Sequence, residues 1–168
     1  MTTGPEGRRV VPGGGRPQRR ESEAEQADRN FNELLQELRV TQTGVQILFA
    51  FLLTLAFQSR FVEIDQLQRS IYVVTLLLCA GATALLIAPV ALHRAMFRKG
   101  RKREVVESAA KLARGGLLLL FLAIVSALLF IFDVVLSRGV AIALASGVAV
   151  VFLVFWYALP WRMARRRP

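Results

Sequence analysis

The sequence has 168 residues, of which 54% are hydrophobic, and its 22 basic and 12 acidic residues give a formal net charge of +10. A soluble domain interrupts its apolar residues at every turn of helix or strand, whereas residues 117–132 contain one polar residue, Ser126. The pattern therefore excludes an ordinary soluble domain. The single cysteine, Cys79, excludes an intramolecular disulfide and a cysteine-based metal site.

The first forty residues divide into two parts. Residues 1–20 combine glycine, proline and arginine with almost no large apolar side chains, so nothing offsets the entropy of ordering, and we expect a disordered basic arm. Within residues 21–39, Phe31, Leu34 and Leu38 recur at helical spacing, which predicts a short amphipathic cytoplasmic helix. This helix either continues into the first membrane span or lies on the inner membrane face.

Four apolar segments follow, and each is long enough to cross a bilayer, which takes about 20 apolar residues. Lipid offers no hydrogen-bond partner to open backbone groups, so these segments must be helices. The spans cover about residues 40–58, 70–92, 115–136 and 139–159. The sequence thus predicts an all-α fold, a four-transmembrane-helix bundle over residues 40–160, with a basic cytoplasmic tail at 161–168.

Local signals mark the ends of these helices. Asp65 followed by Gln68 predicts a cap at the start of the second span, and Pro89 predicts that this helix bends and ends nearby. The chain after Gly100 has helical charge pairing, and Gly115–Gly116 is a candidate hinge at the third span. Aromatic residues are typical of membrane interfaces. We expect Tyr72 at the outer edge and Trp156, Tyr157 and Trp161 at the inner edge.

The basic residues alternate between the two sides of the predicted bundle. The first and third connections hold only Arg60, Arg69 and Arg138, whereas the middle connection and both ends are strongly basic. Short basic loops stay in the cytoplasm, so we expect both termini inside, in the cell (plasma) membrane. The basic cluster of the middle connection is a candidate contact for anionic lipids. Its members are Arg94, Arg98, Lys99, Arg101, Lys102 and Arg103.

Small residues suggest how the helices pack. Gly139, Ala143 and Gly147 recur every four residues on the fourth span, and Ala141 and Ala145 lie on an adjacent face. Such faces let helix backbones approach closely. Two alternatives stay open: a tight intramolecular bundle, or a homo-oligomer formed through the fourth helix.

Transport across a membrane usually needs ionisable groups at depth. Asp133 is the only carboxylate within an apolar segment, about one turn from the outer end of its helix. A charge next to lipid is costly, so Asp133 should face the bundle and pair with a cation, Arg138 being nearest in sequence and Arg60 and Arg69 on the same side. It is either a structural ion pair or a functional group.

Further polar candidates lie toward the cytoplasmic side. Gln42 and Gln46 are four residues apart, with Arg39 close by, and either bond across helices or line a vestibule that opens inward. His93 follows Pro89 and is either a wetted helix end or a pH-sensitive group.

The familiar sequence motifs of catalysis are missing. The chain has no glycine-rich phosphate loop, HExxH motif, nucleophile elbow or pair of catalytic carboxylates. We therefore expect no enzyme, no cofactor and no metal. A base-reading motif is also absent, so the positive charge does not indicate nucleic-acid binding. The expected partners are membrane lipids, a second copy of the chain or another membrane protein.

One stretch of the sequence is specific enough to indicate a family. The string ELRVTQTGVQILFAFLL at Glu37–Leu53, together with Phe57–Gln58, Asp65–Tyr72 and Ala88–Arg94, resembles an uncharacterised actinobacterial family of small four-helix integral membrane proteins over roughly residues 30–160. The resemblance implies a bacterial cell membrane, and some members carry a sodium:proton antiporter label. Two functions stay open: a non-enzymatic accessory, scaffold or envelope-associated protein, or a small secondary transporter, a sodium:proton antiporter in particular.

Overall fold

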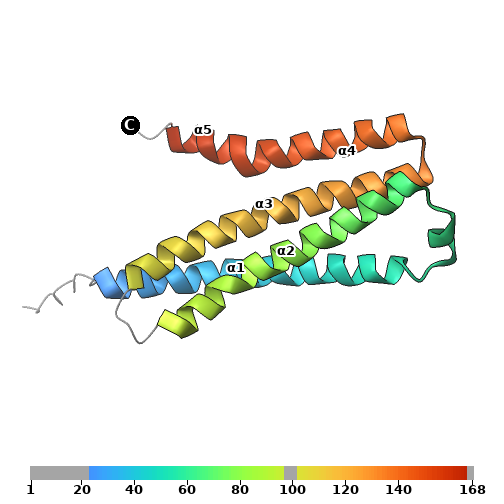
Figure 1. The fold of residues 1–168 in the computed structure, drawn as a ribbon. Coiled ribbons are helices and arrows are strands. Elements are labelled where there is room, and N and C mark those ends of the chain that lie inside the picture. Colours follow the sequence, from blue (N-terminus) through green and yellow to red (C-terminus); the bar gives the residue numbers. More distant parts are fainter. Residues whose placement is uncertain (1–22, 97–101, 166–168) are drawn as a thin grey trace, which may run out of the picture.

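The computed structural model describes residues 23–96 and 102–165, and within them every element is a helix, which confirms the all-α prediction. Four helices are long and apolar enough to span a membrane (Figure 1). The elements are α1 (Glu23–Leu55), the short 3₁₀ helix η1 (Ser59–Glu63), α2 (Gln66–Met96), α3 (Lys102–Val135), α4 (Arg138–Leu153), the π-helical segment η3 (Val154–Ala158) and α5 (Leu159–Arg165).

Helix α1 decides between the two arrangements left open for the amphipathic segment. It runs without a break from Glu23 to Leu55, so the amphipathic segment continues directly into the first span. Its buried residues Phe31, Leu38, Val45 and Leu52 recur every seven residues and form one narrow seam, as in a coiled coil. The expected basic arm at residues 1–20 lies outside the described residues.

The core lies between three helices, α1, α2 and α3, each of which contacts the other two. Three apolar clusters fill it among the described residues: one built around Val45 and Leu86, one around Leu52 and Phe130, and a smaller one of Phe31 and Ala109. Helix α4 packs mainly on α3, burying Ala141 and Ala145. The fourth span therefore lies at the side of a three-helix core, with α5 continuing its direction (Figure 1).

Helices α2 and α3 approach each other closely at two glycines. A Cβ added at Gly116 would lie 2.8 Å from the Leu86 side chain, and one added at Gly81 would lie 2.9 Å from Leu119. Glycine at 116 is therefore required by close packing. The hinge expected at Gly115–Gly116 stays a prediction, and α3 passes through this contact as one uninterrupted helix.

One expectation about α2 needs correction. The helix does not end near Pro89 but continues to Met96, and Pro89 itself is buried. Tyr72, expected at the outer edge of this span, lies near the start of α2 and is buried within the bundle. Its hydroxyl donates to the Leu52 carbonyl at 2.9 Å, because a phenol inside an apolar bundle needs an acceptor.

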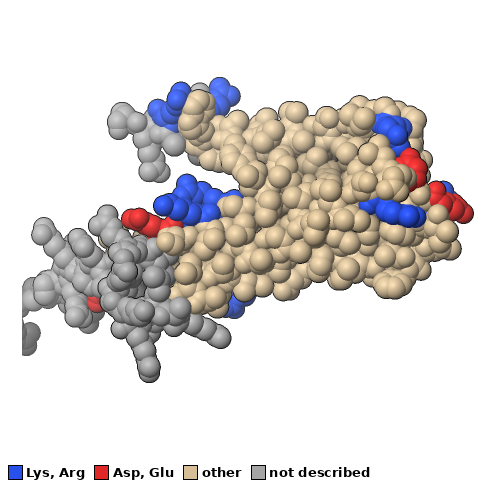
Figure 2. Space-filling model, viewed as in Figure 1, with Lys and Arg blue, Asp and Glu red and all other residues tan. Residues whose placement is uncertain are grey.

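The described surface has the distribution of a membrane protein. On the face in Figure 2, charged side chains gather at the two ends and an uncharged belt lies between them. Large apolar side chains within the belt point outward, among them Ile47, Phe51 and Leu77. An aqueous surface of this kind would be costly, whereas lipid suits it. The chain is an integral membrane protein with four spanning helices.

Candidate functional site

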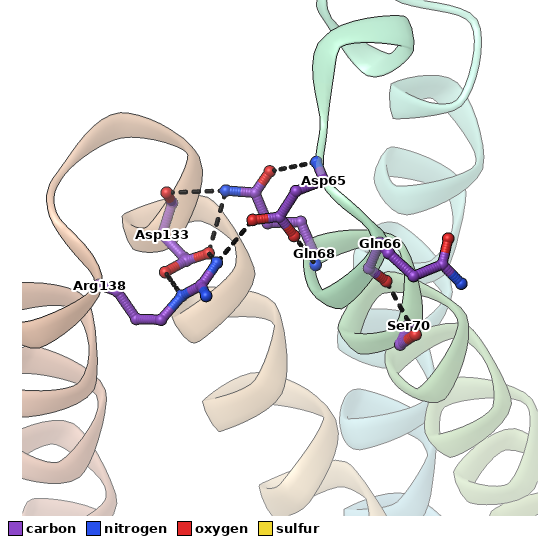
Figure 3. Close-up of polar contacts among 6 residues, drawn as sticks. All are labelled: Asp65, Gln66, Gln68, Ser70, Asp133 and Arg138. Atoms are coloured by element: carbon purple, nitrogen blue, oxygen red, sulfur yellow. Dashed lines mark hydrogen bonds and ion pairs between the residues drawn. The ribbon is translucent and has the colours of Figure 1, made fainter.

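The densest polar cluster lies at the end of the molecule where α2 begins, α3 ends and α4 begins (Figure 3). Four side chains form it: Asp65, Gln68, Asp133 and Arg138. We call this set the Arg138 network. The three helix ends meet because the connection from α3 to α4 contains only Leu136 and Ser137.

The first part of the network is a helix cap. The backbone N–H of Gln68 donates to Asp65 Oδ1 at 2.8 Å, and the backbone N–H of Asp65 donates to Gln68 Oε1 at 3.0 Å. This reciprocal pair satisfies two N–H groups that no helical carbonyl can reach. The predicted cap of the second span is thus confirmed.

The cap also fixes the direction of the Gln68 amide. With its oxygen bound to Asp65, the Nε2 group donates to both the main-chain oxygen and Oδ2 of Asp133, each at 3.0 Å. The Asp133 carbonyl is one of the last of α3, where helical donors run out. One glutamine side chain therefore caps the start of α2 and binds the end of α3.

Arg138 completes the network from the first position of α4. Its Nε donates to Asp133 Oδ1 at 3.1 Å and its Nη2 donates to Asp133 Oδ2 at 3.3 Å. The same Nη2 donates to Asp65 Oδ2 at 2.6 Å. The guanidinium fork suits two carboxylate oxygens at once. The expected partner of Asp133 is therefore Arg138, and the ion-pair prediction is confirmed.

Burial differs sharply across the network. The Asp133 side chain is 3% exposed, whereas those of Arg138 and Asp65 are 49% and 50% exposed. A carboxylate as buried as Asp133 needs a counter-charge and hydrogen-bond donors to remain ionised. Arg138 supplies the charge, and Gln68 adds a neutral donor.

The cap and the ion pair also act on Asp65, which lies outside the spans. The backbone N–H of Gln68 has the largest effect and lowers the pKa of the Asp65 carboxyl below its ordinary value of 3.8; desolvation, the next largest effect, opposes it, and Arg138 lowers the pKa further. A lowered pKa in the folded state means that ionised Asp65 stabilises the fold above pH 3.8. That stabilisation is lost as the pH falls through the lowered pKa.

Polar groups nearer the middle of the core also pair with one another. The hydroxyls of Thr75 on α2 and Ser126 on α3 lie 2.7 Å apart, and Thr75 also donates to the Ile71 carbonyl at 2.7 Å. Thr83 bonds back to the Cys79 carbonyl at 2.8 Å. Among the described side chains, every buried nitrogen and oxygen has a hydrogen-bond partner.

Gln42 bonds across helices, one of the two roles expected for it. Its Nε2 donates to the Leu86 carbonyl of α2 at 2.6 Å, in the turn before Pro89. Gln46 and Arg39 are exposed, so the structure does not gather the three around one site. Gln42 is also separated from Asp133 along the bundle, since it lies at the middle of the first span, Arg29–Leu55, whereas Asp133 lies near the end of α3.

The remaining predicted residues cannot be placed. The side chains of His93 and of the basic cluster lie outside the described part of the chain. That cluster is Arg94, Arg98, Lys99, Arg101, Lys102 and Arg103.

Sequence reasoning missed several partners in these contacts. Gln68 was interpreted only as a local cap, although its second amide group also binds Asp133. Asp65 was not connected to Arg138, which lies 73 residues away in the chain. Ser126 had one available signal, since it is the only polar residue within residues 117–132. A lone hydroxyl in an apolar span needs an acceptor, but the sequence does not say on which helix.

Comparison with known proteins agrees with this architecture. A family model described as a family of unknown function, DUF6328, matches residues 20–160. The chain belongs to this family. No match was found among curated proteins or among solved structures. Membership in DUF6328 covers α1 to η3 entirely, including every residue of the Arg138 network. It confirms the expected resemblance to an uncharacterised family and adds no activity.

Loss of Arg138 should weaken the fold more than loss of another arginine at the same end. We expect Arg138→Gln to lower the melting temperature, because Asp133 is left buried without its counter-charge. Arg69→Gln, at an exposed position of α2, is the matched control. Thermal unfolding in mild detergent measures both. Equal melting temperatures for the two variants would contradict the role given to the network.

Proposed function

We propose that this protein is a non-enzymatic integral membrane protein that serves as an accessory or scaffold component of the cell envelope. The observation that supports this best is that polar side chains within the described spans form hydrogen bonds between helices. Asp133, Gln42, Thr75 and Ser126 each bond to another helix. Their hydrogen-bonding capacity holds the helices together, which is what a structural protein requires.

The exposed face of α4 supports a role in assembly. Gly139, Ala143 and Gly147 are exposed, and a Cβ added at either glycine would have nothing within 4 Å. The adjacent face of α4, with Ala141 and Ala145, is the one that packs on α3. A second helix could therefore reach the α4 backbone closely without disturbing the core. We propose that α4 pairs with α4 of a second copy.

Charge supports an orientation with both chain ends in the cytoplasm of a plasma membrane. Arg114, Arg162 and Arg165 lie toward the end where α1 begins. The opposite end carries Arg60, Arg69 and Arg138, the last of which is paired with two carboxylates. The side richer in arginine and lysine normally stays inside.

The alternative, a small secondary transporter such as a sodium:proton antiporter, would need Asp133 to bind and release an ion. Both Asp133 oxygens already accept bonds from Arg138. Gln42 lies at the middle of the first span, away from Asp133, and its amide is bound to α2. Known transporters gather several binding groups together near the midplane, around broken helices.

A transport assay separates the two functions. We expect purified protein in vesicles with an imposed pH gradient to show the same gradient decay with sodium as with potassium, at the rate of protein-free vesicles. An encapsulated pH-sensitive dye measures the decay. Faster decay that requires sodium and is lost in Asp133→Asn would overturn the accessory role and establish the transporter.

Cysteine crosslinking tests the α4 pairing. In a Cys79→Ala background, Ala143→Cys should form a disulfide-linked dimer in native membranes under mild oxidation. Ile142→Cys, exposed on the neighbouring face of the same helix, is the control and should crosslink several-fold less. Gel mobility without reductant gives the dimer fraction. Equal yields at the two positions would refute a specific α4 interface.

Thiol labelling tests the orientation. A reagent that cannot cross the membrane, applied to intact cells, should label Gln66→Cys and miss Gly100→Cys. The native Cys79 is buried and contributes no background. Permeabilised cells should expose both sites, which controls for expression. Labelling of position 100 alone in intact cells would reverse the proposed topology.

A further inference from the structure

A groove separates α3 from the last part of the chain at the end opposite the Arg138 network. It has a volume of about 490 Å³. Figure 2 shows a notch at this end with basic side chains on both sides of it. The groove is lined from α3 by Arg114 and Leu117, and from the η3–α5 segment by Phe155, Trp156, Tyr157 and Pro160.

Backbone geometry shapes one wall of this groove. Residues Val154–Ala158 form a π-helical turn, in which the Leu159 N–H reaches back five residues to the Val154 carbonyl. Pro160 comes next and lacks an N–H for the turn before it, which favours such a departure from regular α-helix. The wider turn places three consecutive aromatic residues, Phe155 to Tyr157, along the groove.

Aromatic contacts hold this wall against α3. The rings of Phe121 and Phe152 have centroids 6.0 Å apart, and those of Phe152 and Trp156 have centroids 5.3 Å apart and are inclined at 60° to each other. This row connects the middle of α3 with the groove. Contact with Phe152 therefore holds the Trp156 ring in place, while the part of the ring that lines the groove stays accessible. The fluorescence of Trp156 should therefore report on whatever occupies the groove.

The mouth of the groove is positively charged. Arg114 is exposed, and its Nε donates to the Ala110 carbonyl at 3.3 Å, which orients the guanidinium and leaves its two terminal amino groups for another acceptor. Across the groove, Arg162 and Arg165 are exposed on α5, and the Arg165 guanidinium lies 3.6 Å from the centre of the Trp161 ring.

These features match one class of molecule. The aromatic and apolar wall suits an acyl chain, and the arginines suit phosphate oxygens, which guanidinium groups bind with charge-assisted hydrogen bonds. The groove lies where the uncharged belt meets the basic end, the depth at which phospholipid headgroups meet their chains. Free phosphate would leave the apolar wall unused.

We propose that this groove is a binding site for an anionic phospholipid, with Arg114 binding the phosphate and Trp156 contacting the acyl chain. The site is distinct from the basic cluster at positions 94–103. A lipid held here would fill the space between α3 and the η3–α5 segment. A bound lipid is compatible with both an accessory protein and a transporter, so this proposal does not depend on the proposed function.

Tryptophan fluorescence provides a direct test, because the chain contains only two tryptophans. The full chain with Trp161→Phe, in vesicles of phosphatidylcholine, keeps Trp156 as the single fluorophore. Bromine on an acyl chain quenches an indole that it touches. We expect brominated phosphatidylglycerol to reach half-maximal quenching at a roughly fivefold lower mole fraction than brominated phosphatidylcholine, the factor expected for one arginine at an anionic surface.

Charge variants show whether the preference comes from the groove. In the same background, Arg114→Gln should bring the two quenching curves together, while Arg114→Lys should keep most of the difference. Lys111→Gln, exposed on α3 but not a lining residue, is the matched control and should keep all of it. Circular dichroism verifies that each variant is folded.

Two results would overturn the site. The first is identical quenching of the Trp161→Phe protein by the two brominated lipids, which would refute the site before any groove residue is substituted. A loss of preference in Lys111→Gln as large as in Arg114→Gln would show diffuse attraction to a basic surface in place of a bound lipid.

Discussion

The structure depends on one constraint: in a bilayer, each buried polar group must find its partner within the protein, because lipid provides none. The Arg138 network meets this constraint at the most demanding point, a carboxylate that is 3% exposed. Arg138 neutralises Asp133, and Gln68 joins the same carboxylate to the cap of α2. Three helix ends are thereby fixed to each other by groups that also satisfy their own termini.

The rest of the core follows the same rule with weaker groups. Hydroxyls either return to their own helix, as Thr83 does, or pair between helices, as Thr75 and Ser126 do. Glycine serves packing where α2 and α3 approach closely, at Gly81 and Gly116. Association inside a membrane relies on close contact and hydrogen bonds, since apolar burial distinguishes poorly between lipid and protein.

Much of the fold could be predicted from the sequence because the lipid constraint acts on long segments. The four spans, the Asp65–Gln68 cap and the pairing of Asp133 with Arg138 depend on local pattern or short separation along the chain. The close packing at Gly116 and the burial of Tyr72 could not be predicted from the sequence, for a common reason. Each residue's role is set by the facing helix, through Leu86 and the Leu52 carbonyl, and helix order is not written in local sequence.

The side position of α4 has a mechanical consequence. This helix is fastened at Arg138 by the network and along its first turns by small alanines, whereas beyond Leu153 it diverges from α3 at the groove. With the π-turn and α5 it extends over the 25 residues Arg138–Arg162, about 37 Å at 1.5 Å per residue. Beyond the Phe121–Phe152 contact the groove separates this end of the helix from α3, so whatever fills the groove bears on the position of this end more than on that of the end fixed at Arg138.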